Sequence, residues 1–421
     1  MKKLNLMFSQ IGKYMRIKII VVSFFGLLAF WACEEANPIR DEGNDVLQAY
    51  GQMESDTLYA IADTFFVEGK VNTGSSPKLL LGNNQDFEGR FLVKFSTLPN
   101  DTIAIDSLKI IVSAPGSFGD DTNPILGKVY RVTGAWEESV NTDPTWDYLN
   151  NIDISPETSA SFEFPKLDST SYTDYEVELP SRLVDIWRDT TAGDQNHGLL
   201  FDFDGADHIK EFSSREGFFS SRRPRLVFTY RDEVKDTTLR DTIYATMDAS
   251  LIDYKGIFDQ SKIYVAAGYE ANAFFKFNFD SIPANAYMVS VEFRFTEDTL
   301  SSLVNSNRTT EIYLRNVTTE FNQLPFYRID STFTFNVNHS VVLTESTPHI
   351  LSLRDSRRAV VSRSFIQDII NQFMIHGSFY LQFVNPGNDI SVYAIESSEN
   401  ATGIFRPHII LEYYVQTAPR L

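Results

Sequence analysis

Three aspartates at the end of one predicted strand have the spacing of a cation site. Asp202, Asp204 and Asp207 lie in the segment FDFDGAD, residues 201–207. Alternate residues of a strand share a face, so Asp202 and Asp204 point the same way, and a turn at Gly205 would swing Asp207 toward them. Calcium prefers such oxygen ligands, but the distal bidentate glutamate of a twelve-residue calcium loop is missing. The sequence therefore suggests calcium as its one candidate cofactor, with a polar strand end as the alternative.

Aromatic residues form a second group of candidates. Trp146, Tyr148 and Tyr172 lie in a polar and acidic stretch between Trp136 and Tyr175. Carbohydrate sites use rings that stack on pyranose faces, with Arg or Lys added where the sugar is acidic. We expect these three rings to form the ligand platform, and we expect Trp136 to be a core residue.

Arginines near the end of the first half are the basic candidates. Arg215 stands in Ser214-Arg215-Glu216, and Arg223 lies in the segment SRRPR at 221–225. These arginines would line a groove for an acidic glycan. Alternatively, the five donors of Arg215 satisfy loop carbonyls and close one end of a sandwich.

The sequence offers little support for catalysis. It contains no G-x-S-x-G elbow, no H-E-x-x-H and no phosphate-binding glycine loop. The six histidines include no i, i+4 pair on a predicted helix. Glu137 and Glu138, beside Trp136, are the best candidates for the acid and base of a glycan hydrolase. A solvated acidic loop is the better account of these two residues, so we expect no enzymatic activity.

Charge and cysteine content exclude further classes of protein. The formal charge is −19, and residues 1–32 carry five positive charges and no acid, so −19 less five gives −24 for the rest. Nucleic acid is therefore an unexpected partner. A single cysteine excludes an intramolecular disulfide, a thiolate zinc site and a two-cysteine redox motif.

That cysteine lies at the end of a predicted signal peptide. Residues 19–32 are mostly apolar, follow a basic segment, and are too few to cross a hydrocarbon core of about 30 Å comfortably. Phe30-Trp31-Ala32-Cys33 resembles the lipobox of bacterial lipoproteins. We therefore expect residues 1–32 to be removed and Cys33 to carry acyl chains. A short transmembrane anchor is the alternative, and Met15 is a second candidate start.

Residues 33–55 are polar and acidic, which predicts a flexible tether. The acids behind Cys33 resemble the surface-export signals of Bacteroidota lipoproteins, although a solvated linker has the same composition. The expected location is the outer membrane, at the cell surface or on its periplasmic face. The lipid would make the only membrane contact.

An internal repeat divides the rest of the chain. Four blocks recur in the same order at offsets of 183 to 185 residues. The paired blocks are 56–60 and 241–245, 91–99 and 275–283, 107–112 and 290–295, and 223–230 and 406–413. This spacing predicts two tandem domains, the first copy at 56–230 and the second copy at 241–416, joined by a polar linker at 231–240.

The pattern inside each copy is that of half-buried strands. Apolar residues alternate at 91, 93 and 95 and again at 275, 277 and 279, and turn residues separate many short runs. Segments 181–188 and 365–371 instead have helical spacing. The predicted fold class is all-β, with two tandem antiparallel β-sandwich (jelly-roll) domains that each carry one short helix.

The first copy resembles a known family. The matching segments are 62–65, 79–83, 91–99, 129–133 with Trp136, 145–146, 196–200, 212–216 and 223–226. In this order they resemble the DNRLRE-type domain, also called the disaggregatase-related repeat, some members of which are carbohydrate-binding modules found beside alginate lyases. The second copy departs from the pattern, with Ser397-Ser398-Glu399 for Ser214-Arg215-Glu216 and Phe321 for Trp136. The resemblance implies a secreted or cell-surface jelly roll used as a binding or structural module.

The functional expectation is a lipid-anchored surface protein that binds polysaccharide without catalysis. The competing hypothesis is a structural or adhesive envelope protein that binds protein partners. A glycan hydrolase acting through the acidic insert is the third.

Overall fold

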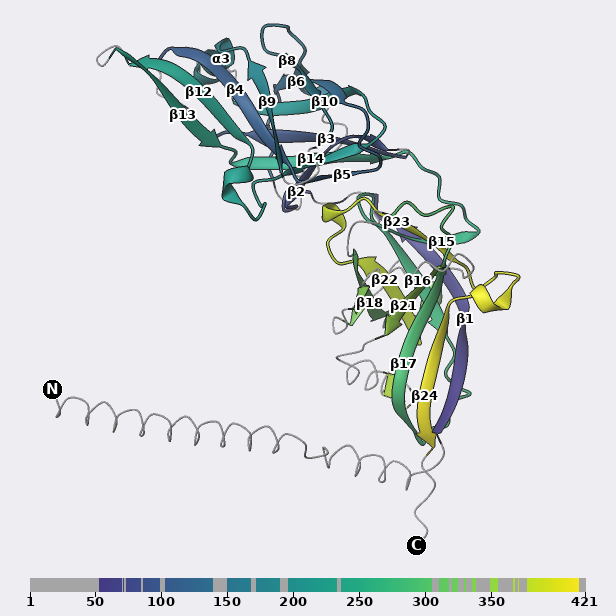
Figure 1. Ribbon diagram of the computed structural model, residues 1–421. Helices are drawn as coiled ribbons and strands as arrows, with labels where there is room; N and C mark the ends of the chain where they lie inside the picture. Colours follow the sequence, from purple (N-terminus) through teal and green to yellow (C-terminus); the bar gives the residue numbers. More distant parts are fainter. Residues whose placement is uncertain are drawn as a thin grey trace, which may run out of the picture.

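The structure is a computed structural model of the chain, and Figure 1 shows two β-rich units. It describes residues 53–138, 150–189, 196–304, 310–337 and 349–415, except for gaps at 70, 72, 85, 99–102, 168–171, 233–235, 318–319, 325–328, 331–334, 338–348, 355–365, 368–369 and 371–376. The predicted signal peptide, the tether and Cys33 lie outside the described residues. Among those described, no helix is long and apolar enough to cross a membrane.

The first unit is a sandwich of two antiparallel sheets around one core. One sheet has the order β5-β11-β2-β3-β10-β6-β7, with β14 on β3 and β8 on β6, and the other has the order β13-β12-β4-β9. The strands are β2 (Lys78–Asn84), β3 (Phe87–Lys94), β4 (Ile105–Ala114), β5 (Gly116–Phe118), β6 (Ile125–Val132), β7 (Ile152–Asp153), β8 (Ala160–Phe164), β9 (Thr173–Leu179), β10 (Leu199–Gly205), β11 (Ile209–Ser213), β12 (Arg225–Asp232), β13 (Thr237–Tyr244) and β14 (Met247–Tyr254).

The second unit has a corresponding order of strands, but these strands form one 11-stranded sheet, because β1 pairs with both β24 and β16 and β17 pairs with β23. Its strands are β1 (Met53–Val67), β15 (Lys262–Ala266), β16 (Ala271–Phe277), β17 (Ala286–Glu297), β18 (Thr310–Val317), β19 (Ile329–Asp330), β20 (Phe335–Val337), β21 (His349–Arg354), β22 (Ser378–Phe383), β23 (Val392–Glu396) and β24 (His408–Val415). The chain of pairings β11-β2-β3-β10-β6 in the first unit corresponds to β23-β15-β16-β22-β18 in the second, and β12-β4-β9 corresponds to β24-β17-β21. The predicted all-β fold with two antiparallel sandwiches is confirmed.

The two units exchange their opening strands. β1 comes from the first sequence copy, yet it pairs along its length with β24 and β16 of the second unit. The equivalent strands of the second copy, β13 and β14, pair with β12 and β3 of the first unit. In Figure 1, β1 in purple runs beside β24 in yellow. The structural units are therefore residues 78–254, and β1 together with 262–415, rather than the expected 56–230 and 241–416.

The expected linker at 231–240 is part of a hairpin. β12 ends at Asp232 and β13 begins at Thr237, and these two residues face each other in the ladder. The polar composition of this segment reflects an exposed hairpin end instead of a connection between domains. The chain instead passes between the units at 68–77 and again at 255–261.

The alternation of apolar residues along the central strands explains which side chains form the two cores. Phe91, Val93 and Phe95 are fully buried in the first core, and Phe275 and Phe277 are buried in the second. These strands also bury residues on their outer face: Leu92 packs with Trp136, and Phe274 packs with Tyr380 and Phe321. Because both faces are covered, each central strand contributes to two apolar layers.

The predicted helix is α3 (Arg182–Arg188), which buries Leu183, Val184 and Trp187 against the first core. In the second unit Ile366, Gln367 and Ile370 are helical, and both isoleucines are buried. A third apolar cluster joins the units. It includes Leu80, Phe87, Phe118 and Ile209 from the first unit and Tyr264, Ala266, Ala271, Ile390, Val392 and Ala394 from the second.

Candidate functional site

Arg215 lies at the centre of a network of three carboxylates in the first unit. It follows β11 in a turn in which the Glu216 N–H donates to Ser214 Oγ at 3.0 Å. Arg215 Nη2 lies 2.6 Å from Glu138 Oε2 and 2.5 Å from Glu216 Oε1. Its backbone N–H donates to Asp248 Oδ2 at 2.6 Å. Loops and a strand far apart in sequence thus meet at one guanidinium.

The electrostatics of this network are those of a partly buried ion cluster. Burial raises the pKa of Asp248 well above its ordinary value, and the charges of Glu216 and Glu138 raise it further. Burial acts to lower the pKa of Arg215, but the charges of Glu138 and Glu216 outweigh it and raise that pKa. Asp248 Oδ1 is buried without a hydrogen-bond partner. Such a network favours the closing role expected for Arg215 over direct ligand contact.

The same carboxylates are the strongest candidate metal ligands among the described residues. One ligand oxygen each of Glu138, Glu216 and Asp248 can be chosen within 4.8 Å of one another. The guanidinium of Arg215 already forms ion pairs with two of them, Glu138 and Glu216, however. Glu138 is therefore engaged with Arg215 and with the backbone N–H of Asp248, whereas its expected partner Glu137 is exposed.

The structure does not assemble the expected calcium site. Asp202 forms an ion pair with Arg90, and Asp204 is exposed. Asp207 accepts hydrogen bonds from Asn123 Nδ2 at 2.6 Å and is 2.9 Å from His208 Nδ1. Each aspartate thus has different surroundings, because the strand β10 has an irregular register between Phe203 and Gly205.

A buried charged group lies just beyond this strand. Asp121 Oδ1 is 2.6 Å from Lys210 Nζ and 3.0 Å from His208 Nε2, and the side chains of Lys210 and His208 are fully buried. Burial lowers the pKa of Lys210. The group is closed on itself within the sandwich, which is the arrangement of a structural ion pair.

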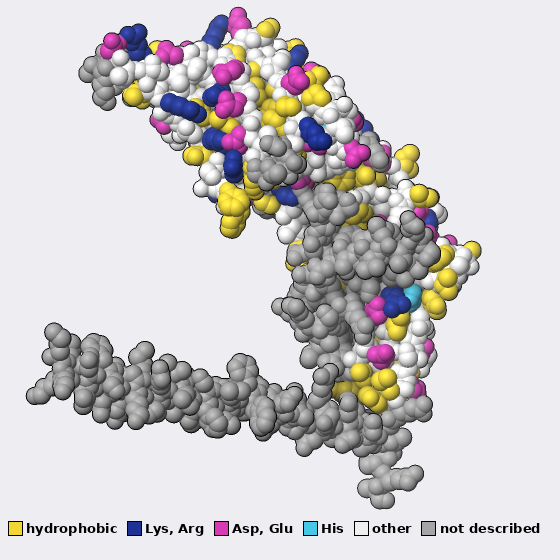
Figure 2. All heavy atoms as spheres, viewed as in Figure 1, with side chains coloured by type: hydrophobic (Ala, Val, Ile, Leu, Met, Phe, Trp, Pro, Cys, Tyr) yellow, Lys and Arg dark blue, Asp and Glu magenta, His cyan; other side chains and the backbone are white. Residues whose placement is uncertain are grey.

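Tyr172 belongs to an exposed aromatic patch. Its ring contacts Phe219 edge to face at 5.8 Å, Phe219 contacts Phe218 in the same way at 4.9 Å, and the guanidinium of Arg222 lies 5.3 Å from the centre of the Tyr172 ring. Phe218 is 91% exposed and Phe219 is 49% exposed. Figure 2 shows hydrophobic side chains at the surface of the first unit, among acidic and basic ones. We call Tyr172, Phe218, Phe219 and Arg222 the aromatic patch. Trp146 and Tyr148 lie outside the described residues.

The other arginines of this segment have structural partners. Arg222 and Arg225 share the carboxylate of Asp174, at 3.0 and 2.8 Å. Arg223 is half-buried, and its backbone carbonyl accepts a hydrogen bond from Arg225. Two guanidiniums on one carboxylate leave a local excess of positive charge beside the aromatic patch.

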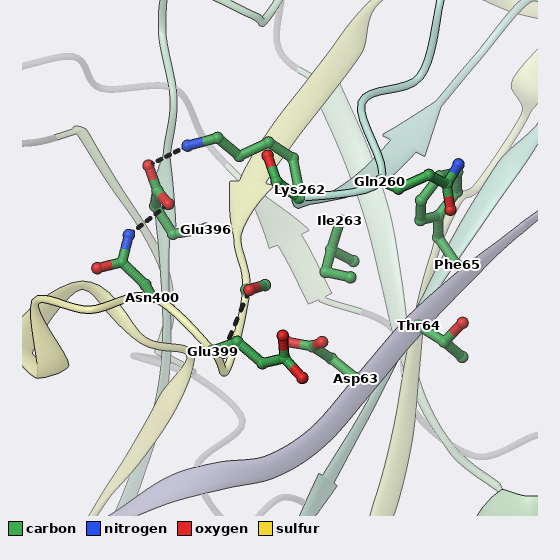
Figure 3. A pocket seen from close by; sticks show the side chains of 11 residues that line it. Asp63, Thr64, Phe65, Gln260, Lys262, Ile263, Glu396, Glu399 and Asn400 are labelled. Carbon is green, nitrogen blue, oxygen red and sulfur yellow. Dashed lines mark hydrogen bonds and ion pairs between the residues drawn. The ribbon is translucent and has the colours of Figure 1, made fainter.

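The second unit has a cleft at the position that corresponds to the Arg215 network. The cleft has a volume of about 460 Å³. It is lined by Asp63, Thr64, Phe65, Gln260, Ser261, Lys262, Ile263, Glu396, Ser397, Glu399 and Asn400. Figure 3 shows the carboxylates of Asp63 and Glu399 next to one another, with Lys262 directed toward Glu396. Burial raises the pKa of Asp63, and the nearby Glu399 raises it further.

Sequence reasoning missed Asp63, Asp248, Phe218 and Phe219 as site residues. The repeat contained a signal for the first two, since Asp63 and Asp248 are separated by the offset of 185 that relates the opening strands. Phe218 and Phe219 come shortly after the recognised Ser214-Arg215-Glu216 segment, with only Gly217 between them. An apolar pair in such a turn signals an exposed surface feature.

Comparisons with known proteins give no family for this chain. No family model matches it, and no curated protein matches it. Among solved structures, T=1 particles derived from infectious bursal virus match at 10% identity over 88% of this chain and 75% of that chain, with a TM-score of 0.11. The Macrobrachium rosenbergii nodavirus structure matches at 6% identity over 86% of this chain and 89% of that chain, with a TM-score of 0.14. These scores are too low to inform fold or function.

Proposed function

We propose that this protein binds polysaccharide without catalysis, through the aromatic patch of its first unit. The observation that carries the proposal is the exposure of Phe218 beside Phe219 and Tyr172. Monomeric proteins seldom leave grouped large rings in water unless the rings have a ligand. Aromatic faces stack on the apolar faces of sugars, and the neighbouring Arg222 would bind a hydroxyl or carboxylate of the same chain.

The resemblance of residues 56–230 to DNRLRE-type domains supports this proposal, because some of those domains bind carbohydrate. The lipobox-like segment before Cys33 supports placement at a bacterial outer membrane. We propose that lipid on Cys33 makes the membrane contact. A Cys33→Ser variant should then move from the membrane fraction to the soluble fraction while keeping its fold.

The test of glycan binding uses a matched pair of variants on equivalent turns. Tyr172→Ala with Phe218→Ala removes the patch, and Ile404→Ala is the control, since Ile404 is 67% exposed on the corresponding 3-10 turn of the second unit. On an array of neutral and acidic glycans, we expect the double variant to lose binding at least tenfold and the control to keep it. Equal binding by both variants would rule out the patch as the glycan site.

The competing function is docking of a protein partner on the same patch. Exposed aromatic residues are also enriched at protein interfaces, so Phe218 favours this alternative as well. A chain that ignores every glycan but forms a stable complex lost in the double variant would establish it. Turnover of a glycan that disappears in Glu138→Gln would instead contradict the non-catalytic proposal.

A further inference from the structure

The cleft of the second unit has the same backbone frame as the Arg215 network. The Ser398 N–H donates to Asp63 Oδ2, as the Arg215 N–H donates to Asp248 Oδ2. The Glu399 N–H donates to Ser397 Oγ at 3.2 Å, as the Glu216 N–H donates to Ser214 Oγ. The repeat offset and the hydrogen bonds therefore agree that Ser398 takes the place of Arg215.

The two sites differ in one side chain, which is Arg215 in the first unit and Ser398 in the second. In the first unit a guanidinium binds Glu216 and Glu138 beside Asp248. In the second unit Ser398 brings no positive charge, and its neighbours Ser397 and Glu399 line a cleft together with Asp63. Among the described residues, no guanidinium or ammonium lies within hydrogen-bond reach of Asp63 or Glu399.

The basic residues around the cleft are engaged elsewhere. Lys262 Nζ is 2.6 Å from Glu396 and 3.2 Å from Asp298. Arg406 Nε donates to the backbone carbonyl of Asn400 at 3.0 Å. Lys262 thus has two carboxylate partners, Glu396 and Asp298, and Asp63 and Glu399 add two further carboxylates, which leaves a net negative charge at the cleft.

We propose that this cleft binds an arginine side chain of a peptide or partner protein, whose guanidinium takes the place that Arg215 fills in the first unit. Glu399 would accept its N–H groups as Glu216 accepts those of Arg215, and Asp63, which lies beside Glu399, would be the second carboxylate. The planar fork of a guanidinium suits two neighbouring carboxylates. This function goes beyond glycan binding and uses the other unit.

The geometry favours an organic cation over a metal ion. Calcium needs six to eight oxygen ligands at about 2.3 to 2.6 Å. Among the described residues, a three-carboxylate group within 4.8 Å occurs at Glu138, Glu216 and Asp248, and the cleft residues do not form one. A volume of about 460 Å³ also accommodates a whole arginine side chain. Phe65 lines the cleft and provides an apolar surface for the methylene groups.

The first experiment compares three amino-acid probes whose side chains have similar lengths. N-acetyl-arginine amide, N-acetyl-citrulline amide and N-acetyl-lysine amide are each titrated into the protein and followed by NMR. We expect saturable binding of the arginine probe, at least tenfold weaker binding of the neutral citrulline probe, and intermediate binding of lysine. Equal affinities for arginine and citrulline would overturn the proposal, as would calcium binding that excludes the arginine probe.

The second experiment introduces an arginine at position 398 of the second unit and, in a separate variant, removes Arg215 from the first. Ser398→Arg should fill the cleft from within and abolish binding of the arginine probe. Arg215→Ser should open the equivalent site and raise the number of probes bound from one to two. Asp63→Asn keeps an acceptor for the Ser398 N–H, so it should fold normally and weaken binding at least tenfold. Unchanged binding in a folded Ser398→Arg protein, checked by circular dichroism, would refute the proposal.

Failure here is distinguishable from failure of the glycan proposal. Ser398 lies in the second unit, so Ser398→Arg should leave glycan binding unchanged. Conversely, the Tyr172→Ala and Phe218→Ala variant should bind the arginine probe as the parent does.

Discussion

The two units have equivalent strands in the same order, but they differ at the turn that contains Arg215 in the first unit and Ser398 in the second. In the first unit the guanidinium of Arg215 pairs with Glu138 and Glu216, whereas in the second unit Ser398 brings no charge and Asp63 and Glu399 line a cleft. The backbone around both positions makes the same hydrogen bonds. The duplicated units have thus kept the same backbone hydrogen bonds at this turn. The residue at the position of Arg215 or Ser398 decides whether a guanidinium occupies the acidic site or a cleft remains.

The opening strands give a second contrast between the units. β1 and the pair β13–β14 are equivalent in sequence, yet each completes the sandwich built from the other copy. β14 buries residues 248–251, whereas the equivalent residues 63–66 of β1 are only half-buried. Only four residues connect β12 to β13, which favours a local hairpin and leaves the second unit to β1.

Removal of β1 should have the largest effect. A variant that lacks residues 53–67 should leave the second unit unfolded, because β24 and β16 would lose a shared partner, while the first unit stays folded. Limited proteolysis with mass spectrometry would show rapid cleavage within 262–415 and protection of 78–254. Loss of protection in the first unit instead would mean that β1 pairs with its own copy.

Disulfide trapping provides a control that keeps the chain intact. Thr57 lies opposite Ile410 in β24, and Val227 is the residue of the first unit that corresponds to Ile410. In a Cys33→Ser background, Thr57→Cys should form a disulfide with Ile410→Cys and not with Val227→Cys. The opposite result would refute the exchange.

Truncation of buried core side chains should have the next largest effect on stability. Phe91 stacks on Phe201 at 4.4 Å, and Phe275 packs on Phe295 at 4.8 Å; both are fully buried. We expect Phe91→Ala and Phe275→Ala each to lower the free energy of unfolding by about 3–5 kcal/mol. Calorimetry should show each substitution acting on its own unit's transition, with Ile404→Ala as a near-neutral exposed control. A single shared transition would show that the apolar cluster between the units makes them one cooperative body.

The buried Asp248 should make stability depend on pH. Its pKa is raised in the folded state by burial. Between its unfolded pKa, about 3.9, and its folded pKa, the folded protein holds more protons, so the free energy of unfolding falls as pH rises, by up to about 1.4 kcal/mol per pH unit. Asp248→Asn should remove this contribution, and urea unfolding at several pH values would measure it. An unchanged pH slope, with Asp204→Asn as the exposed control, would contradict this expectation.

The smallest effect is expected at Trp136. Its Nε1–H donates to the His197 carbonyl at 2.7 Å, whereas the second unit has Phe321 in the corresponding layer. Trp136→Phe should therefore lower the free energy of unfolding by about 1 kcal/mol. Phe321→Trp should give no matching gain. An effect on Trp136→Phe above that of the core truncations would show a larger role for this indole.

The sequence was sufficient to predict strands, the duplication and the helix at 182–188, because alternating Phe and Val residues and the Leu183, Val184 and Trp187 stripe are local signals. The sequence could not predict the exchange of β1, since the opening strands of the two copies are similar in sequence and this similarity does not indicate on which core each one packs. The polar segment at 231–240 resembled a linker because hairpin ends and linkers are both solvated.

The candidate sites were predicted less well for a related reason. Arg215 and Tyr172 were recognised by residue type, but the partners of Arg215 come from distant segments, and Asp248 reaches it only because β14 pairs with the first unit. Asp202 and Asp207 are close in sequence, yet they have different partners, Arg90 for the first and Asn123 for the second.

The path of β1 also determines how the molecule would respond to tension. The strand begins at Met53, where the membrane-proximal segment would attach, and its other end leads directly into the first unit. Drag on a glycan held by the first unit would pull β1 lengthwise from both ends. Its ladders with β24 and β16 would then be loaded in shear, so many hydrogen bonds would have to break together instead of one at a time.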